Sequence, residues 1–140
     1  MAATPEGDAI VAARTPRAPK TRHELARIGE DHAARHLASR GYRILARNYR
    51  AGRGEVDIVA QRRDLLAFVE VKARSSDEYG APREGVVAWK QRRIAHAAAV
   101  YLGSAARRDW KTRYDVIEVY LSADGRVRRV EHIEGAFDAS

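Results

Sequence analysis

Apolar residues recur at helical spacing soon after the start of the chain. One face of a helix with 3.6 residues per turn would carry Leu25, Ile28, Ala33 and Leu37. The preceding residues Thr21 to Glu24 have the form of a capping box, in which a threonine hydroxyl and a glutamate carboxylate each satisfy a free backbone N–H. Gly41 is suited to end the helix. The pattern therefore predicts a helix that begins at Thr21 and ends before Gly41.

Two residues of this helix do not follow the simple apolar pattern. At about 100° per residue, Gly29 falls in the middle of the apolar face and Glu30 falls near its edge. A glycine at the centre of the face allows another element to approach closely. Glu30 would then lie at the rim of that contact.

Alternating and continuous apolar runs predict five strands and a second helix. The strands are expected at residues 42–50, 55–60, 65–74, 114–121 and 127–133, and the second helix at residues 86–103. In the second strand Val56, Ile58 and Ala60 would share a face. The predicted order αβββαββ indicates an α/β fold with a mixed sheet in a single domain over residues 21–134. Residues 1–20 are expected to form a disordered basic tail, and residues 135–140 a frayed C-terminal tail.

Three ionisable residues interrupt the apolar strands. Asp57 lies between Val56 and Ile58, and Glu70 and Lys72 flank Val71 at the end of the most apolar strand. Alternation places Glu70 and Lys72 on one face. Burying such charges costs several kcal/mol unless they are paired or bind an ion. Two interpretations stay open from the residues alone: structural ion pairs at a sheet edge, or a site for a divalent cation.

The cation interpretation assigns a role to each group. Asp57 and Glu70 could ligate Mg²⁺ or Mn²⁺ if their strands are neighbours, and the backbone carbonyl of Val71 could add a third oxygen. Glu30 could hold a metal-bound water from the side of the first helix. Lys72 would orient or deprotonate an attacking water, or stabilise charge on a phosphate. Glu55, on the same strand face as Asp57, is expected to cap the turn or to pair with an arginine rather than to bind the metal.

The charge distribution points to a polyanionic partner. The net charge is +7, and the basic excess gathers in residues 83–113 and in an arginine series from Arg40 to Arg53. Such patches suit DNA, although a solvated arginine-rich surface would have the same composition. The candidate DNA contacts are Arg43, Arg47, Arg50, Arg53, Arg74, Lys90, Arg92 and Arg93.

Several other chemistries are disfavoured. The chain has no cysteine, which excludes disulfides, thiolate zinc sites and cysteine nucleophiles. His32 and His36 have a zinc-compatible spacing, but Ala33 stands where a zinc protease has glutamate. No apolar run of about 18 residues and no secretory signal are visible, so a cytoplasmic protein is expected. Trp89, Tyr101 and Trp110 are interpreted as core or boundary residues, and Asp115 as structural.

Two sequence strings carry a resemblance to a known family. GEVDIVA at residues 54–60 and FVEVKARS at residues 68–75, together with Gly29-Glu30 and Asn48, resemble the bacterial YraN-like family of predicted endonucleases. That family is similar to archaeal Holliday-junction resolvases and to the PD-(D/E)xK superfamily. The resemblance covers about residues 22–121, and it implies a restriction-endonuclease-like αβββαβ core. It also implies Asp57 and Glu70 as metal ligands, Lys72 as the catalytic lysine and Glu30 as an assisting carboxylate.

Two functional hypotheses follow. The first is an Mg²⁺- or Mn²⁺-dependent endonuclease that hydrolyses DNA phosphodiester bonds, with branched or damaged DNA in recombination or repair as candidate substrates and a homodimer as a candidate assembly. The second is a non-catalytic nucleic-acid-binding module on the same fold. A protein-interaction role is a third and weaker hypothesis.

Overall fold

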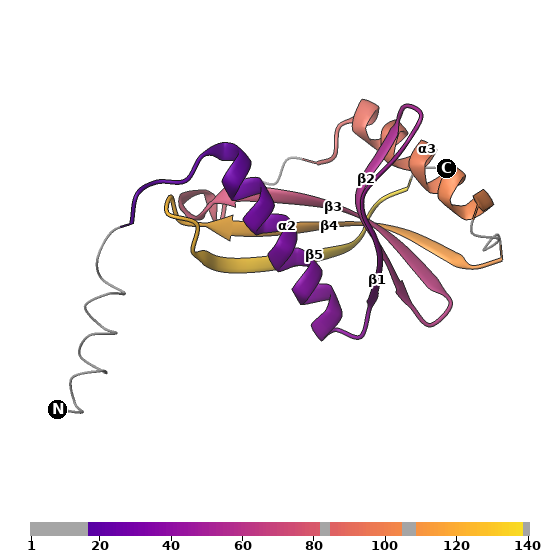
Figure 1. The fold of residues 1–140 in the computed structure, drawn as a ribbon, viewed down its shortest axis with the longest axis horizontal. Coiled ribbons are helices and arrows are strands. Elements are labelled where there is room, and N and C mark those ends of the chain that lie inside the picture. The colour runs from indigo at the N-terminus through magenta and orange to yellow at the C-terminus, as the bar shows by residue number, and fades with distance from the viewer. Residues whose placement is uncertain (1–16, 82–84, 105–108, 139–140) are drawn as a thin grey trace.

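A five-stranded mixed sheet lies between two helices in the computed structural model, which describes residues 17–81, 85–104 and 109–138 (Figure 1). In chain order the elements are α2 (Arg22–Ser39), β1 (Arg43–Ala51), β2 (Gly54–Arg62), β3 (Leu65–Ser75), the short 3₁₀ turn η1 (Ser76–Glu78), α3 (Ala88–Ser104), β4 (Lys111–Leu121) and β5 (Val127–Phe137). The strand order in the sheet is β1-β2-β3-β4-β5. Only the β3–β4 pair among these strands is parallel, and α3 connects the two. The predicted α/β fold, with its αβββαβ core and flanking helices, is confirmed.

Helix α2 begins as its capping residues predict. The Thr21 hydroxyl accepts a hydrogen bond from the Glu24 N–H at 3.1 Å, and the Glu24 carboxylate accepts one from the Thr21 N–H at 2.8 Å. Gly41, just beyond the helix, has a φ of 89°, which a residue with a side chain rarely adopts. The predicted close approach at Gly29 is also confirmed, since a Cβ there would lie 3.3 Å from the Ala73 Cβ in β3. This contact holds the next residue, Glu30, near the sheet.

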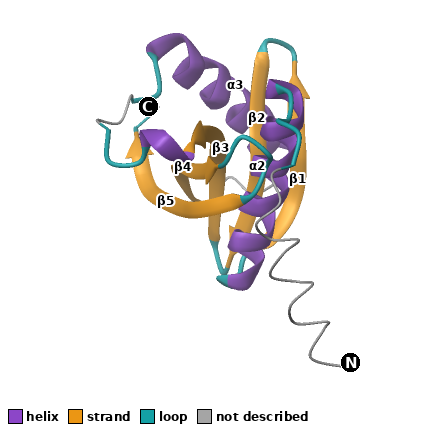
Figure 2. Ribbon diagram, turned by 90° about the vertical axis from the view of Figure 1, so that its left-hand side faces the viewer, coloured by secondary structure: helices purple, strands orange, loops and turns teal. Residues whose placement is uncertain are grey.

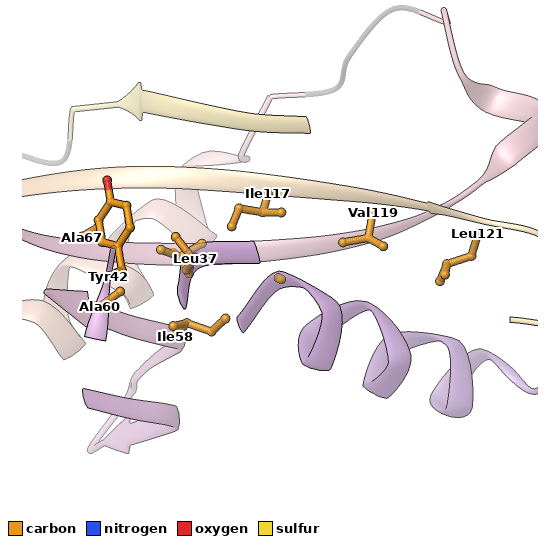
Figure 3. Close-up of a cluster of buried hydrophobic side chains, with 10 residues drawn as sticks. Leu37, Tyr42, Ile58, Ala60, Ala67, Ile117, Val119 and Leu121 are labelled. Atoms are coloured by element: carbon orange, nitrogen blue, oxygen red, sulfur yellow. The ribbon is translucent and has the colours of Figure 1, made fainter. Parts of the chain in front are cut away.

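The two helices cover opposite faces of the sheet (Figure 2). Successive residues of β3 point to opposite sides, so Ala67 and Val69 pack in the cluster under α2, while Leu66 and Phe68 pack under α3. Figure 3 shows the cluster under α2, whose labelled members are Leu37, Tyr42, Ile58, Ala60, Ala67, Ile117, Val119 and Leu121. Each buried aliphatic side chain contributes roughly 1.5–3 kcal/mol relative to its exposed form.

Strand β2 departs from the prediction that Val56, Ile58 and Ala60 share one cluster. Ile58 and Ala60 pack under α2, but Val56 packs under α3. The cause is the course of the strand: the β2–β3 ladder ends at the Ile58–Val69 pair, so the first residues of β2 leave β3 and approach α3. Gly54 marks this approach, because a Cβ there would lie 2.5 Å from the Ala97 nitrogen.

The ends of the domain also differ from the prediction. Strand β5 continues to Phe137, whereas a frayed tail was expected from residue 135. Phe137 stacks on Tyr114 with ring centroids 5.2 Å apart, which gives the last strand residues an apolar partner. Most of the predicted N-terminal tail, residues 1–16, lies outside the described residues, and Lys20 donates its backbone N–H to the Ala123 carbonyl at 2.8 Å. None of the helices in the described ranges is long and apolar enough to cross a membrane.

Substitution of Gly54 tests how closely α3 must approach β2. The Gly54→Ala protein is expected to lose roughly 1–3 kcal/mol of unfolding free energy, because the new methyl group would overlap the helix backbone at Ala97. Gly103→Ala is the matched control, since nothing lies within 4 Å of a Cβ at that position. Urea unfolding measures both, and equal midpoints for the two variants would contradict the close approach.

Candidate metal and nucleic-acid site

Two acidic side chains meet where β2 leaves β3. The Val71 N–H of β3 donates to Asp57 Oδ2 at 2.8 Å, so the Asp57 carboxylate takes a backbone donor just beyond the last strand pair. Glu70, the residue before Val71, is 8% exposed, and its charge acts on the Asp57 carboxyl to raise the pKa of Asp57. The short turn between β2 and β3 thus brings together Asp57 and Glu70, the two carboxylates that the sequence predicts to lie close.

These carboxylates line a hollow of about 250 Å³, which we call the carboxylate hollow. Its wall contains four acids and two bases, contributed by α2, β2, β3 and α3: Glu30, Glu55, Asp57, Glu70, Lys90 and Arg93. Val71 also lines it. Within a strand, the N–H and C=O of one residue point to the same neighbour. The Val71 N–H donates to Asp57, so the Val71 carbonyl points to the same side of β3. A third oxygen ligand would have to point this way.

The surroundings of Asp57 disfavour the charged form of its carboxylate. Burial is the largest cause that raises its pKa, and the charge of Glu70 raises it further; the hydrogen bond from Val71 opposes both. The pKa of Asp57 is about 7, against an ordinary value of 3.8. A divalent cation would relieve both burial and repulsion by supplying positive charge.

The protein itself supplies two counter-charges from α3. Lys90 Nζ lies 2.8 Å from Glu70 Oε2, and this carboxylate raises the pKa of Lys90. Arg93 lies 2.6 Å from Glu55 Oε1, and Arg50 lies 3.2 Å from Glu55 Oε2. The expected pairing of Glu55 with an arginine is confirmed. Lys90 and Arg93 are one helical turn apart, so both face the hollow from the same side of α3.

The acids fit a hard divalent cation in number. The described residues contain no group of three or more His, Asp or Glu side chains arranged to hold a metal ion. Mg²⁺ is usually held by only one or two carboxylates, and waters and substrate phosphates complete its shell. Asp57 and Glu70, with the Val71 carbonyl beside them, match that requirement. Glu30 lines the rim and lies 3.9 Å from Arg47.

Lys72 lies in a neighbouring hollow. It points to the same face as Glu70, as predicted, and lines a space of about 400 Å³ that we call the side hollow. Lys90 and Val71 line both hollows, so the two spaces adjoin. Glu118, which is 1% exposed, is the residue opposite Lys72 in the register of the β3–β4 ladder. Lys90 thus contacts Glu70 directly, while Lys72 opens on the adjoining side hollow.

The predicted DNA contacts have four different surroundings. Four of them contact acids that line the hollow: Arg47, Arg50, Lys90 and Arg93. The Arg53 carbonyl accepts a hydrogen bond from Arg93 at 3.4 Å. Arg92 is exposed on α3. Arg74 has a different environment: its side chain is 14% exposed and pairs with Glu118 at 3.2 Å. Arg43 lies at the other end of β1, roughly 20 Å along the strand from Arg50.

Sequence reasoning missed two features of α3. Lys90 is predicted to contact DNA, and the structure adds that it pairs with Glu70; at 100° per residue it falls on the stripe of Ile94, Ala97 and Ala98, a sign that it also faces the sheet. Trp89 is expected to be a core or boundary residue, but it is 50% exposed. Its position about 100° around the helix from Lys90, away from that stripe, carries the signal. Both residues lie in the first turn of α3, where Lys90 contacts Glu70.

Asp115 is bound by structural contacts, as expected. It is fully buried under α2, where it accepts hydrogen bonds from Arg113 at 2.7 and 2.8 Å, from Gly135 N–H at 3.0 Å, and lies 2.8 Å from His132 Nε2. Burial alone would raise the pKa of Asp115, but these hydrogen bonds lower it.

The raised pKa of Asp57 predicts a pH-dependent stability in metal-free buffer. Between about pH 4 and pH 7 the folded protein keeps a proton on Asp57 that the unfolded chain has released, so the contribution of Asp57 to the unfolding free energy should fall as pH rises through this window. Asp57→Asn removes this titration, so the slope of the unfolding free energy against pH should change by an amount equivalent to at most one bound proton. Urea midpoints at several pH values measure it, with the exposed turn variant Asp64→Asn as control. An unchanged slope in Asp57→Asn would contradict the raised pKa.

Comparison with known proteins places this arrangement in a family. A UPF0102 protein of Moorella thermoacetica is 47% identical over 117 residues, which cover 84% of this chain and 98% of the relative. A second, from Chlorobaculum tepidum, is 53% identical over 114 residues, covering 78% of this chain and 88% of the relative. A sequence model described as "Uncharacterised protein family UPF0102" matches residues 29–119, a stretch that runs from Gly29 beside the rim carboxylate to Val119 in β4. The chain therefore belongs to the UPF0102 family.

Proposed function

We propose that this protein is a metal-dependent endonuclease that hydrolyses phosphodiester bonds in DNA. The observation that carries the proposal is the Asp57–Glu70 pair, two interacting carboxylates that line one hollow together with Lys90 and Arg93. Strongly perturbed carboxylates in a concave site are a mark of functional positions. The αβββαβ order and the resemblance to predicted endonucleases support the same reading.

The residues of the hollow have complementary tasks in this proposal. Asp57, Glu70 and the Val71 carbonyl would hold Mg²⁺ or Mn²⁺, which when bound lowers the pKa of a water and neutralises phosphate charge. Glu30, at the rim, would orient a water of the metal shell. Lys72 and Lys90 flank Val71 from β3 and α3, so one can serve the attacking water while the other contacts the phosphate.

The basic residues around the hollow would seat the DNA backbone. Arg50 keeps 75% of its side chain exposed and Arg93 keeps 44%, although both pair with Glu55. Exposed pairs of this kind contribute little to stability and exchange readily for phosphate contacts. Arg53 and Arg92 extend the same surface. Arg74 and Arg43 contribute less in this arrangement, since one is tied to Glu118 and the other lies far along β1.

Variants of the carboxylates and of Lys72 test the chemistry. Purified protein is expected to nick or cleave DNA with Mg²⁺ or Mn²⁺, and Asp57→Ala, Glu70→Ala and Lys72→Ala are each expected to reduce the rate at least about 100-fold, as loss of a group that acts on the transition state does. Asp64→Ala, at the opposite turn, is the control for a lost surface acid. A panel of branched, nicked, single-stranded and linear DNA would define the substrate. Retained cleavage in both Asp57→Ala and Lys72→Ala would overturn the assignment.

A non-catalytic nucleic-acid-binding module is the second candidate, and one observation favours it. Lys90 and Arg93 already neutralise Glu70 and Glu55 within the protein, at 2.8 and 2.6 Å. A site whose acids are satisfied by its own bases could bind DNA through the remaining arginines, with a steep salt dependence and no cleavage.

Calorimetric metal titration separates the two candidates. The nuclease reading expects Mn²⁺ or Mg²⁺ to bind with release of protons near pH 7, because the ion must displace the proton held on Asp57. Asp57→Asn and Glu70→Gln should weaken this binding, and Asp64→Asn should leave it unchanged. Absence of metal binding that depends on Asp57 and Glu70 would make the binding module the better reading.

A further inference from the structure

An exposed tryptophan lies on α3 next to Lys90, a residue that lines the carboxylate hollow. Trp89 is 50% exposed, and it is the largest of the exposed apolar side chains among the described residues; the others are Tyr79, Val87 and Val100. Leaving so large an apolar ring in water forgoes the stabilisation that burial would give. An exposed aromatic ring next to a candidate site is therefore a candidate contact for a ligand.

Trp89 is connected to the hollow through its neighbours on α3. The Arg93 guanidinium lies 5.8 Å from the centroid of the Trp89 ring, and the same guanidinium pairs with Glu55 at 2.6 Å in the wall of the hollow. The next residue, Lys90, pairs with Glu70. Trp89 is thus adjacent in sequence to Lys90, which contacts Glu70, and one helical turn from Arg93, which contacts Glu55.

The surroundings of the ring are cationic. Arg92 and Arg93 follow on the same helix, and Arg93 also bonds to the Arg53 carbonyl in the β1–β2 turn. An aromatic ring bordered by guanidinium groups matches a nucleotide, whose base stacks on the ring while its phosphate meets the cations. A base inside a duplex is already stacked and paired, so the ring can receive only a base that is unpaired.

We propose that Trp89 is a stacking platform for an unpaired DNA base next to the carboxylate hollow. The proposal deepens the proposed function and rests on it for the location of the cut. It specifies the substrate class: DNA in which a single-stranded segment, such as a gap, a flap or the arm of a branch, adjoins the phosphodiester that the hollow receives. Blunt, fully paired duplex would bind through the arginines alone.

A second copy of the chain is the alternative occupant of this helix surface. Residues 89, 93, 96 and 100 recur on one side of α3, but Arg93 and His96 separate Trp89 from Val100. Two copies that met along this stripe would bring like charges together. Charge complementarity therefore favours the polyanion.

Binding without metal tests the proposal on the full-length chain. In buffer with a chelator and fixed salt, a duplex with an oligo(dT) gap is expected to bind more tightly than blunt duplex of the same length, and Trp89→Ala should weaken the gapped complex roughly five- to thirty-fold. Trp89→Phe should restore most of that loss. Val100→Ala, exposed on the same side of the helix, is the control. With Trp110 replaced by Phe, the fluorescence of Trp89 should be quenched by oligo(dT).

Distinct outcomes separate this proposal from its alternatives. Equal affinity of Trp89→Ala and wild type for gapped DNA, or an equal loss on blunt duplex, would overturn the platform. So would sedimentation showing a dimer that Trp89→Ala dissociates, because a second copy would then cover the ring. Cleavage measured separately with Mn²⁺ tests the nuclease: gap preference without cleavage supports the platform alone, and cleavage without gap preference overturns the platform alone.

Discussion

The hydrogen bond from the Val71 N–H to the Asp57 carboxylate holds the candidate site together. Strands β2 and β3 pair as far as Ile58 and Val69, and then they separate. Two residues beyond Val69, the Val71 N–H points to the same side and would meet a β2 carbonyl if the ladder continued. Asp57 Oδ2 accepts it instead, at 2.8 Å. A side chain thus satisfies a backbone donor, and the space between the separating strands becomes the carboxylate hollow.

The separation of the strands depends in turn on α3. Gly54 has no side chain, which lets the start of β2 lie against the α3 backbone at Ala97. The same contact sets the height of the helix over the sheet, so Lys90 and Arg93 reach Glu70 and Glu55. Burying carboxylates is costly, and removing one partner of such a pair costs more than the pair contributes. The helix position and the acids of the hollow therefore depend on each other.

Much of this arrangement was readable from the sequence because it is local. The capping box at Thr21, the close approach at Gly29, and the meeting of Asp57 with Glu70 across a short turn all follow from neighbouring residues. What the sequence did not reveal depends on contacts between distant elements. Lys90 lies 20 residues from Glu70, and Arg74 lies 44 residues from Glu118, so their pairing requires the placement of α3 and β4. The split of Val56 from Ile58 likewise follows from where β2 leaves the sheet, which alternation alone cannot locate.

Two aspartates of the sheet, Asp115 and Asp57, lie in contrasting surroundings. Asp115, on the α2 side, is surrounded by donors from Arg113, His132 and Gly135, and its pKa is lowered. Asp57, near the start of β2, has one backbone donor and a second carboxylate nearby, and its pKa is raised to about 7. Burial acts to raise the pKa of both aspartates, so their hydrogen-bond donors and neighbouring charges decide the difference. A protein that needed Asp57 only for stability would gain by pairing it as Asp115 is paired. The raised pKa of Asp57 is explained if a cation from outside the chain completes the site.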